Sequence, residues 1–134
     1  MPEPMAAAHA RLVEPAGRAT EVRLGSHTLV ADRPGAGGGP TPVELLTAAL
    51  ASSSAMAART HLERGGDPGD VEVVVTLDPG PPPVLYRRVL VAFRMEPEEA
   101  RRLAGALERT EVSMMLRPAF TVRTQIEHAG AALD

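Results

Sequence analysis

The sequence predicts one α+β domain, because two helical segments are set among strand-like segments without the regular alternation of a βαβ protein. Strand-like alternation comes first, a long helical pattern follows, and a hairpin, a second helix and a last strand complete the 134 residues. This length fits a single domain, residues 1–134, with a workable core. We expect flexible ends, as an N-terminal arm over 1–8 and a loose tail over 129–134.

The composition narrows the possible functions. Hydrophobic residues make up 44% of the chain and aromatic residues only 2%, so the core must consist of aliphatic side chains and methionine. A formal net charge of −3 gives no reason to expect nucleic acid or an anionic membrane as a partner. The absence of cysteine excludes disulfides, iron–sulfur clusters and cysteine zinc sites. No stretch reaches the roughly 20 apolar residues of a membrane span, so we expect a cytoplasmic protein without a cofactor.

The first strands are predicted to form a small antiparallel meander. The segments 9–14 and 20–31 carry strand-like alternation, with turn-forming residues between and within them. The glycine-rich loop 32–39 then precedes the long helix. Such a loop can cradle phosphate at a helix N-terminus, but this one lacks the Lys-Ser/Thr of a P-loop and is followed by Pro40 and Pro42. A hinge loop is the favoured interpretation.

The long helix has clear start and stop signals. Thr41 is a good N-cap residue, Pro42 fits the first helical position, and Glu44 completes a capping box. Gly65 and Gly66 are typical of the far end. The sequence therefore predicts a helix from Pro42 to about residue 64.

A 3.6-residue period predicts which face of this helix is buried. Ser53 lies on that face, so its hydroxyl is predicted to be buried and to need a partner, since an unpaired buried hydroxyl costs about 1–3 kcal/mol. The apolar positions of the face are Leu45, Leu46, Ala49, Leu50, Met56 and Ala57.

The second half of the chain alternates strands and helices. Residues 71–77 and 84–95 are predicted to pair as a β-hairpin at one edge of the sheet. Acidic residues in a first turn predict a second helix over 96–110. A short helical turn over 112–116 and a final strand over 119–127 follow.

The long helix carries a motif that resembles the central helix of the OsmC/Ohr family, the osmotically inducible and organic-hydroperoxide-resistance proteins. That family's motif has the form GPxPxELLLAALAGCxxMxxR, and this chain reads GPTPVELLTAALASSSAMAAR. The matching residues are Gly39, Pro40, Pro42, Glu44, Leu45, Leu46, Ala48, Ala49, Leu50, Ala51, Met56 and Arg59. The resemblance covers roughly residues 17–127. It implies a curved antiparallel sheet with a long central helix and a second helix, in an intertwined homodimer with its pockets at the subunit interface.

The same resemblance places the family's two cysteines at positions that lack a thiol here. The peroxidatic cysteine of the central helix corresponds to Ser53. The resolving cysteine opens a C-P-V-S-x-x-L run, which the TEVSMML stretch matches at Val112, Ser113 and Leu116, with Thr110 at the cysteine position. Thiol peroxidase chemistry requires a thiolate that is oxidised to a sulfenic acid and then to a disulfide. That activity is therefore excluded.

Two further positions follow from the resemblance alone. Peroxidase members use an arginine near the N-terminus, which corresponds to Arg18 after Gly17, with Arg23 as the alternative. The glutamate of the Ohr type stands one residue before Glu44, where this chain has Val43. The PxELL spacing matches OsmC-like subfamilies instead.

Other chemistry has weaker support in the sequence. Ser53 as a nucleophile would need a base within about 3 Å, whereas His61 is eight residues further along, about 12 Å along the axis and about 80° round the helix. No GxSxG elbow is present. The four histidines show no metal-ligand spacing, so we expect no metal site, although a site shared across a dimer stays open.

Three functional hypotheses follow. The first is a non-catalytic OsmC-like protein that binds a small apolar or amphipathic molecule in the interface pocket. The second is an enzyme that uses non-thiol chemistry there, and the third is a purely structural or interaction protein. Methionine on a helical face is more often ordinary core than a pocket wall. The pocket residues that the first hypothesis names are Ser53, Thr110, Arg18, Glu44, Met56 and Met114.

Overall fold

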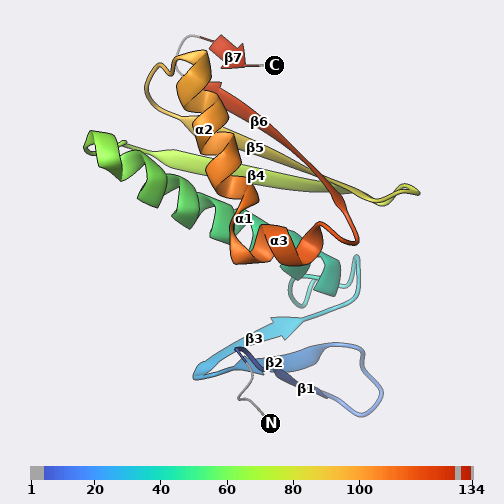
Figure 1. Cartoon of the computed structure of the whole chain (residues 1–134). Helices are drawn as coiled ribbons and strands as arrows, with labels where there is room; N and C mark the ends of the chain where they lie inside the picture. The colour runs from blue at the N-terminus through green and yellow to red at the C-terminus, as the bar shows by residue number, and fades with distance from the viewer. Residues whose placement is uncertain (1–4, 129–130, 134) are drawn as a thin grey trace. The chain divides into compact units, whose positions relative to one another are not determined.

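The computed structural model describes residues 5–128 and 131–133, and it confirms the α+β class (Figure 1). The chain divides into two compact units, Met1–Leu46 and Thr47–Asp134. The prediction of a single domain over 1–134 stays a prediction.

The first unit contains the predicted antiparallel meander. Its three strands are β1 (His9–Leu12), β2 (Thr20–Leu24) and β3 (His27–Ala31), in the spatial order β1-β2-β3. The segment 20–31 forms two strands with the predicted turn between them, where Gly25 adopts a left-handed φ of 60° and reverses the chain. Leu24 and His27 then pair directly across the turn.

The long helix α1 (Pro42–Leu62) begins where its capping signals predict. The backbone N–H of Glu44 donates to Thr41 Oγ1 over 3.0 Å, and the Thr41 N–H donates to the Glu44 carboxylate over 2.9 Å. This reciprocal pair is the predicted capping box. The far end tightens into a 3₁₀ turn, η1 (Glu63–Gly65), before Gly66 turns the chain at a φ of 110°.

The second unit is built on a four-stranded sheet in the order β4-β5-β6-β7. β4 (Val71–Asp78) and β5 (Val84–Val91) form the predicted antiparallel hairpin at one edge. β6 (Thr121–His128) is parallel to β5, so the sheet is mixed rather than wholly antiparallel. The chain between β5 and β6 holds two helices, which supply the long crossover that a parallel pair requires.

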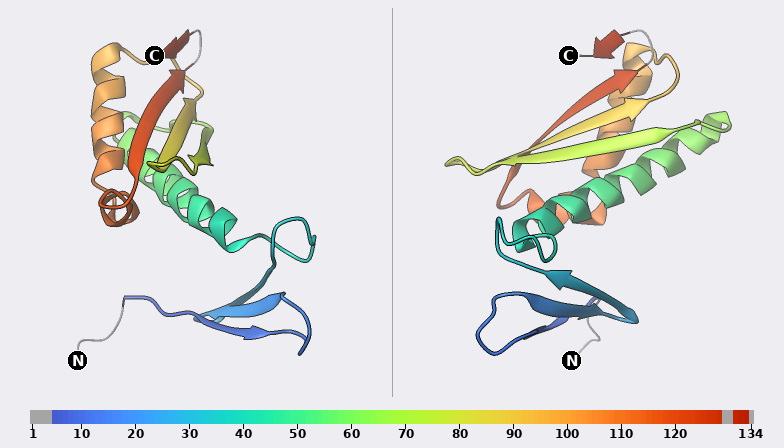
Figure 2. Two further views of the ribbon diagram at one scale, coloured as in Figure 1. Left: turned by 90° about the vertical axis from the view of Figure 1, so that its right-hand side faces the viewer. Right: turned by 180° about the vertical axis from the view of Figure 1, so that it is seen from behind.

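These helices are α2 (Pro97–Glu108) and the short α3 (Glu111–Leu116). Figures 1 and 2 show α1 and α2 on the same face of the four-stranded sheet. A buried cluster fills the space between them and the sheet. It comprises Ala58 of α1, Val89 and Val91 of β5, Met95, then Ala100, Leu103 and Leu107 of α2, and Ile126 of β6.

The chain ends are described only in part. Residues 1–4 of the predicted arm lie outside the described residues, and Met5–Ala8 are exposed. Within the predicted tail, residues 129, 130 and 134 also lie outside them, whereas Ala131–Leu133 form β7 and pair with β6 instead of being loose. In the described part of the chain, no helix is long and apolar enough to cross a membrane.

Candidate functional site

Ser53 and Thr110 line the same open hollow in the second unit. Ser53 comes from α1, and Thr110 stands at the N-cap of α3. The hollow has a volume of about 590 Å³. Its wall consists of Ala49, Ser52, Ser53, Met56, Ala57, Thr60, Thr110, Glu111 and Val112. Small residues and short hydroxyls therefore dominate the surface where the OsmC/Ohr motif places two thiols.

The buried face of α1 differs from the predicted one. The fully buried positions are Leu50, Ser54 and Ala58, which are spaced four residues apart. Ser53 is only half-buried, and Met56 is 70% exposed, so the prediction of a buried Ser53 hydroxyl and a buried Met56 is wrong. Because α1 is rich in alanine and serine, the face with Ser53 and the neighbouring face with Ser54 are almost equally apolar. The face that contains Ser54 is the one that packs toward the sheet. The buried hydroxyl with a partner belongs to Ser54.

That partner is Arg87 of β5, a residue to which the sequence pattern assigns no role. Its side chain is fully buried and makes four hydrogen bonds. Nη1 donates to Ser54 Oγ over 3.0 Å and to Ser113 Oγ over 2.8 Å. Nε donates to Thr124 Oγ1 over 3.0 Å, and Nη2 donates to the Glu108 carboxylate over 3.1 Å. One guanidinium thus joins α1, α2, α3 and two strands.

The buried positive charge of Arg87 lies beside the carboxylate of Glu108. Burial lowers the pKa of the Arg87 guanidinium, and the adjacent Glu108 carboxylate opposes that effect. Arginine nevertheless stays protonated in proteins, so the site holds a full positive charge. Arg117 lies on the other side of the same carboxylate, with Nη1 3.6 Å from Glu108 Oε2. Arg87, Glu108 and Arg117 therefore form a row of charged side chains that runs from the core to the surface.

A chain of hydrogen bonds connects this buried charge to the wall of the hollow. The Thr110 hydroxyl donates to Ser113 Oγ over 2.8 Å, and the Ser113 hydroxyl donates to the Leu107 carbonyl over 2.8 Å. Thr110 Oγ1 also accepts the Ser113 backbone N–H over 3.2 Å, which caps α3. Thr110 is therefore held in place through Ser113, which itself contacts Arg87.

Arg18 and Glu44, the other polar residues of the predicted pocket, belong to the first unit. Arg18 is exposed, and its Nη1 lies 3.4 Å from the carbonyl oxygen of Gly17. It lines a separate hollow of about 230 Å³ together with Asp32 and Arg33. Glu44 is exposed and serves the α1 capping box. Both side chains thus have local structural contacts within residues 1–46.

The methionines of the predicted pocket are exposed. Met56 lines the hollow, whereas Met114, 55% exposed on α3, is not among its wall residues. Met115 is 63% exposed. Met56 is thus the one methionine of the predicted pocket that the structure places in the wall of the hollow.

The hollow offers little acid–base chemistry. Glu111 is the ionisable residue among the described wall residues, and His61 lines a different cavity. His61 therefore does not serve Ser53, as the helical spacing predicts. Among the described residues, no group of three or more histidine, aspartate or glutamate side chains is placed to hold a metal ion.

Comparison with solved structures shows an OsmC-like fold. An OsmC-like protein from Mycoplasma pneumoniae is 13% identical, with a TM-score of 0.76 over 94% of this chain and 98% of that chain. An OsmC organic hydroperoxide resistance protein from Legionella pneumophila is 20% identical, with a TM-score of 0.67 over 94% and 98%. The protein OhrB of Bacillus subtilis is 20% identical, with a TM-score of 0.65 over 91% and 97%. No protein-family model and no curated protein sequence match the chain.

Proposed function

We propose that this chain is a cysteine-less OsmC-like protein that binds a small apolar or amphipathic molecule in the hollow lined by Ser53, Met56 and Thr110. The observation that carries the proposal is the shared position of Ser53 and Thr110 in one hollow of about 590 Å³. The resemblance to the OsmC/Ohr motif assigns the two reacting cysteines to these two positions, which supports a binding site at this hollow. The wall of the hollow carries hydroxyl groups at these two positions and no thiol.

The chemistry of the wall favours binding over turnover. Hydroxyls and methyl groups surround the hollow, and Met56 presents a flexible, polarisable side chain that adapts to apolar ligands. An activated serine would need a base within hydrogen-bond reach. Glu111 is the candidate ionisable group among the described wall residues, and it lies in the exposed first turn of α3. A binding protein therefore has more support than an enzyme with non-thiol chemistry.

The proposal includes a homodimer in the cytoplasm. Met56 on α1 and Met114 on α3 are 70% and 55% exposed. A second copy of the chain that covers these side chains would remove apolar surface from water and enclose the open hollow. Arg18 and Glu44 are the polar residues that the family resemblance adds to the enclosed site.

A neutral fluorescent probe tests the proposal. Nile red is titrated into the full chain, into Met56→Gln and into Met115→Gln, while light scattering reports the mass relative to the 14.1 kDa chain. We expect a dimer that binds the probe saturably, with about tenfold weaker binding in Met56→Gln and unchanged binding in Met115→Gln. Met115 is a matched control because it is similarly exposed but does not line the hollow.

Three results would overturn the proposal. A well-folded dimer without saturable probe binding would favour a structural or interaction protein. Equal loss of binding in both methionine variants would place the probe on the general apolar surface and not in the hollow. Steady turnover of a substrate that Ser53→Ala abolishes would establish the enzymatic alternative.

A further inference from the structure

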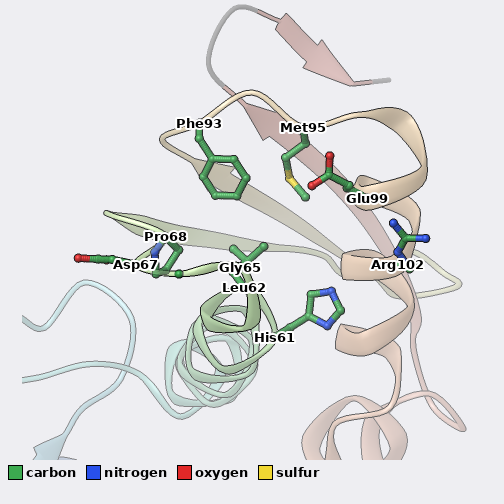
Figure 3. A pocket seen from close by; sticks show the side chains of 10 residues that line it. His61, Leu62, Gly65, Asp67, Pro68, Phe93, Met95, Glu99 and Arg102 are labelled. Atoms are coloured by element: carbon green, nitrogen blue, oxygen red, sulfur yellow. The ribbon is translucent and has the colours of Figure 1, made fainter.

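A second cavity lies at the C-terminal end of α1, and it shares no wall residue with the hollow of Ser53 and Thr110. It has a volume of about 290 Å³. The end of α1, the η1 turn, the loop after β5 and the first turns of α2 form its wall (Figure 3). All of these segments belong to the second unit.

One side of this cavity is apolar. Leu62, Pro68, Phe93 and Met95 supply the apolar wall, and Met95 is only 3% exposed. Figure 3 shows Phe93 and Pro68 on the side opposite His61 and Arg102. A flat apolar group can therefore contact the Phe93 ring while a polar end reaches the opposite wall.

The opposite wall has unused hydrogen-bond donors. Within the described residues, the imidazole of His61 has no hydrogen-bond partner. The guanidinium of Arg102 has only a long ion pair, with Nη1 3.7 Å from Glu98 Oε1, and its side chain is 61% exposed. A guanidinium matches the geometry of a carboxylate, and a neutral imidazole can donate one N–H to the same group.

Several arginines act on His61. Burial and the charges of Arg64, Arg102 and Arg109 all lower the pKa of the His61 imidazole, which favours its neutral form. The wall also carries two carboxylates, and Figure 3 shows that of Glu99 beside Met95. Glu99 accepts the Glu96 N–H over 3.2 Å in the α2 capping box, and Asp67 accepts the Gly69 N–H over 2.9 Å. Figure 3 shows the Asp67 side chain directed away from the cavity.

We infer that this cavity binds a small monocarboxylate with an apolar body, whose carboxylate lies between Arg102 and His61 and whose ring or chain packs on Phe93 and Met95. The volume of about 290 Å³ is at the lower end of small-molecule sites. It therefore fits an acid of about ten non-hydrogen atoms. Neutral apolar molecules would leave the His61 imidazole without a hydrogen-bond partner and would add none to the long ion pair of Arg102 with Glu98. Multiply charged anions would bring excess charge against the apolar wall.

Benzoate is the probe that tests this inference on the full chain. The side-chain NMR signals of the Met95 methyl and the His61 ring report binding at both ends of the cavity. We expect saturable shifts of both signals with a Kd on the order of 1 mM. Benzyl alcohol, which has the same ring and no charge, should bind at least about tenfold more weakly.

The neighbouring arginines of α2 provide a matched pair of variants. Arg102→Gln should weaken benzoate binding about tenfold or more, whereas Arg101→Gln should leave it unchanged. Both guanidiniums are exposed and both contact Glu98, but only Arg102 lines the cavity. His61→Gln, which also removes the imidazole from the cavity wall, should weaken binding several-fold.

Several results would overturn the inference. Unchanged Met95 and His61 signals at roughly 20 mM benzoate would exclude the site at any useful affinity. Equal weakening in Arg101→Gln would mean general attraction to a basic surface, and equal affinity for benzyl alcohol would mean a purely apolar cavity. Met56→Gln, which tests the other site, should not change benzoate binding, so failure of one proposal is distinguishable from failure of the other.

Discussion

Arg87 Nη1 lies 2.8 Å from Ser113 Oγ, and this contact ties the sheet to the short helix that presents Thr110 to the hollow. The same nitrogen reaches Ser54, which follows Ser53 in α1. A single buried cation therefore fixes the backbone beside both positions where the OsmC/Ohr motif places a cysteine. Arg87, Ser54 and Ser113 are buried beneath the hollow, and Thr110 is the residue that connects their hydrogen bonds to its wall.

Removal of the Arg87 side chain should strongly destabilise the protein. Arg87→Ala leaves Ser54, Ser113 and the partly buried Glu108 carboxylate without their shared donor. Loss of one member of a buried charged pair costs about 3–5 kcal/mol, so we expect a decrease of that size in the free energy of unfolding. Urea denaturation followed by circular dichroism measures it.

Arg88→Ala is the control for this prediction. Arg88 is the next residue of β5, but its side chain is 48% exposed and pairs with Glu127 at the surface over 2.8 Å. Exposed ion pairs contribute about 0–1 kcal/mol, so this variant should remain nearly as stable as the wild type. Similar losses in both variants would contradict the role assigned to the Arg87 network.

The start of α1 gives a smaller and more local prediction. Thr41→Ala removes the Thr41 oxygen that accepts the Glu44 N–H, and we expect a loss of about 1 kcal/mol in the free energy of unfolding. Ser52→Ala is the control, because Ser52 is an exposed residue within the same helix. Alanine has the higher helix propensity, so this change should be neutral or slightly stabilising. A loss in Ser52→Ala that equals the loss in Thr41→Ala would argue against the capping box.

A pair of cysteines tests the placement of Ser53 against Thr110. Under mild oxidation, Ser53→Cys with Thr110→Cys should form a disulfide within one chain, detected by mass spectrometry after digestion. The pair Ala48→Cys with Thr110→Cys is the control, because Ala48 lies about 140° round α1 from Ser53 and is not a wall residue of the hollow. A disulfide tolerates Cα separations of only about 7 Å or less. Failure of the first pair, or equal formation in the second, would contradict the correspondence with the family's two cysteines.

Local signals allowed the sequence to predict most of the fold. The Thr41 and Glu44 capping box begins α1, and alternation predicted the hairpin of β4 and β5. The parallel pairing of β6 with β5 was not predicted, since strand direction depends on how the crossover helices return the chain. Tertiary contacts of this kind leave no periodic signal in the strand itself.

The buried polar network shows the same limit at the site. Alternation placed Arg87 on the same strand face as Leu85 and Val89, and that face is fully buried. An arginine on an otherwise apolar strand face could therefore have predicted that Arg87 is buried and needs polar partners. Its partners, Ser54 and Ser113, are 33 and 26 residues away in the sequence, and only the folded chain shows that they converge.

The benzoate cavity gives a prediction about pH. The arginines near His61 stay charged throughout, and Glu99 and Asp67 are the carboxylates in the same cavity wall. His61 has a pKa below its ordinary value of about 6.5 in the free protein, and a bound carboxylate should raise that pKa because it favours the imidazolium. Binding therefore takes up a proton, and benzoate affinity should increase as the pH falls from 7 towards 5.5. NMR titration of the His61 ring with and without benzoate measures both pKa values, and His61→Gln should abolish the pH dependence. An unchanged His61 pKa at saturating benzoate would show that the carboxylate binds away from the imidazole.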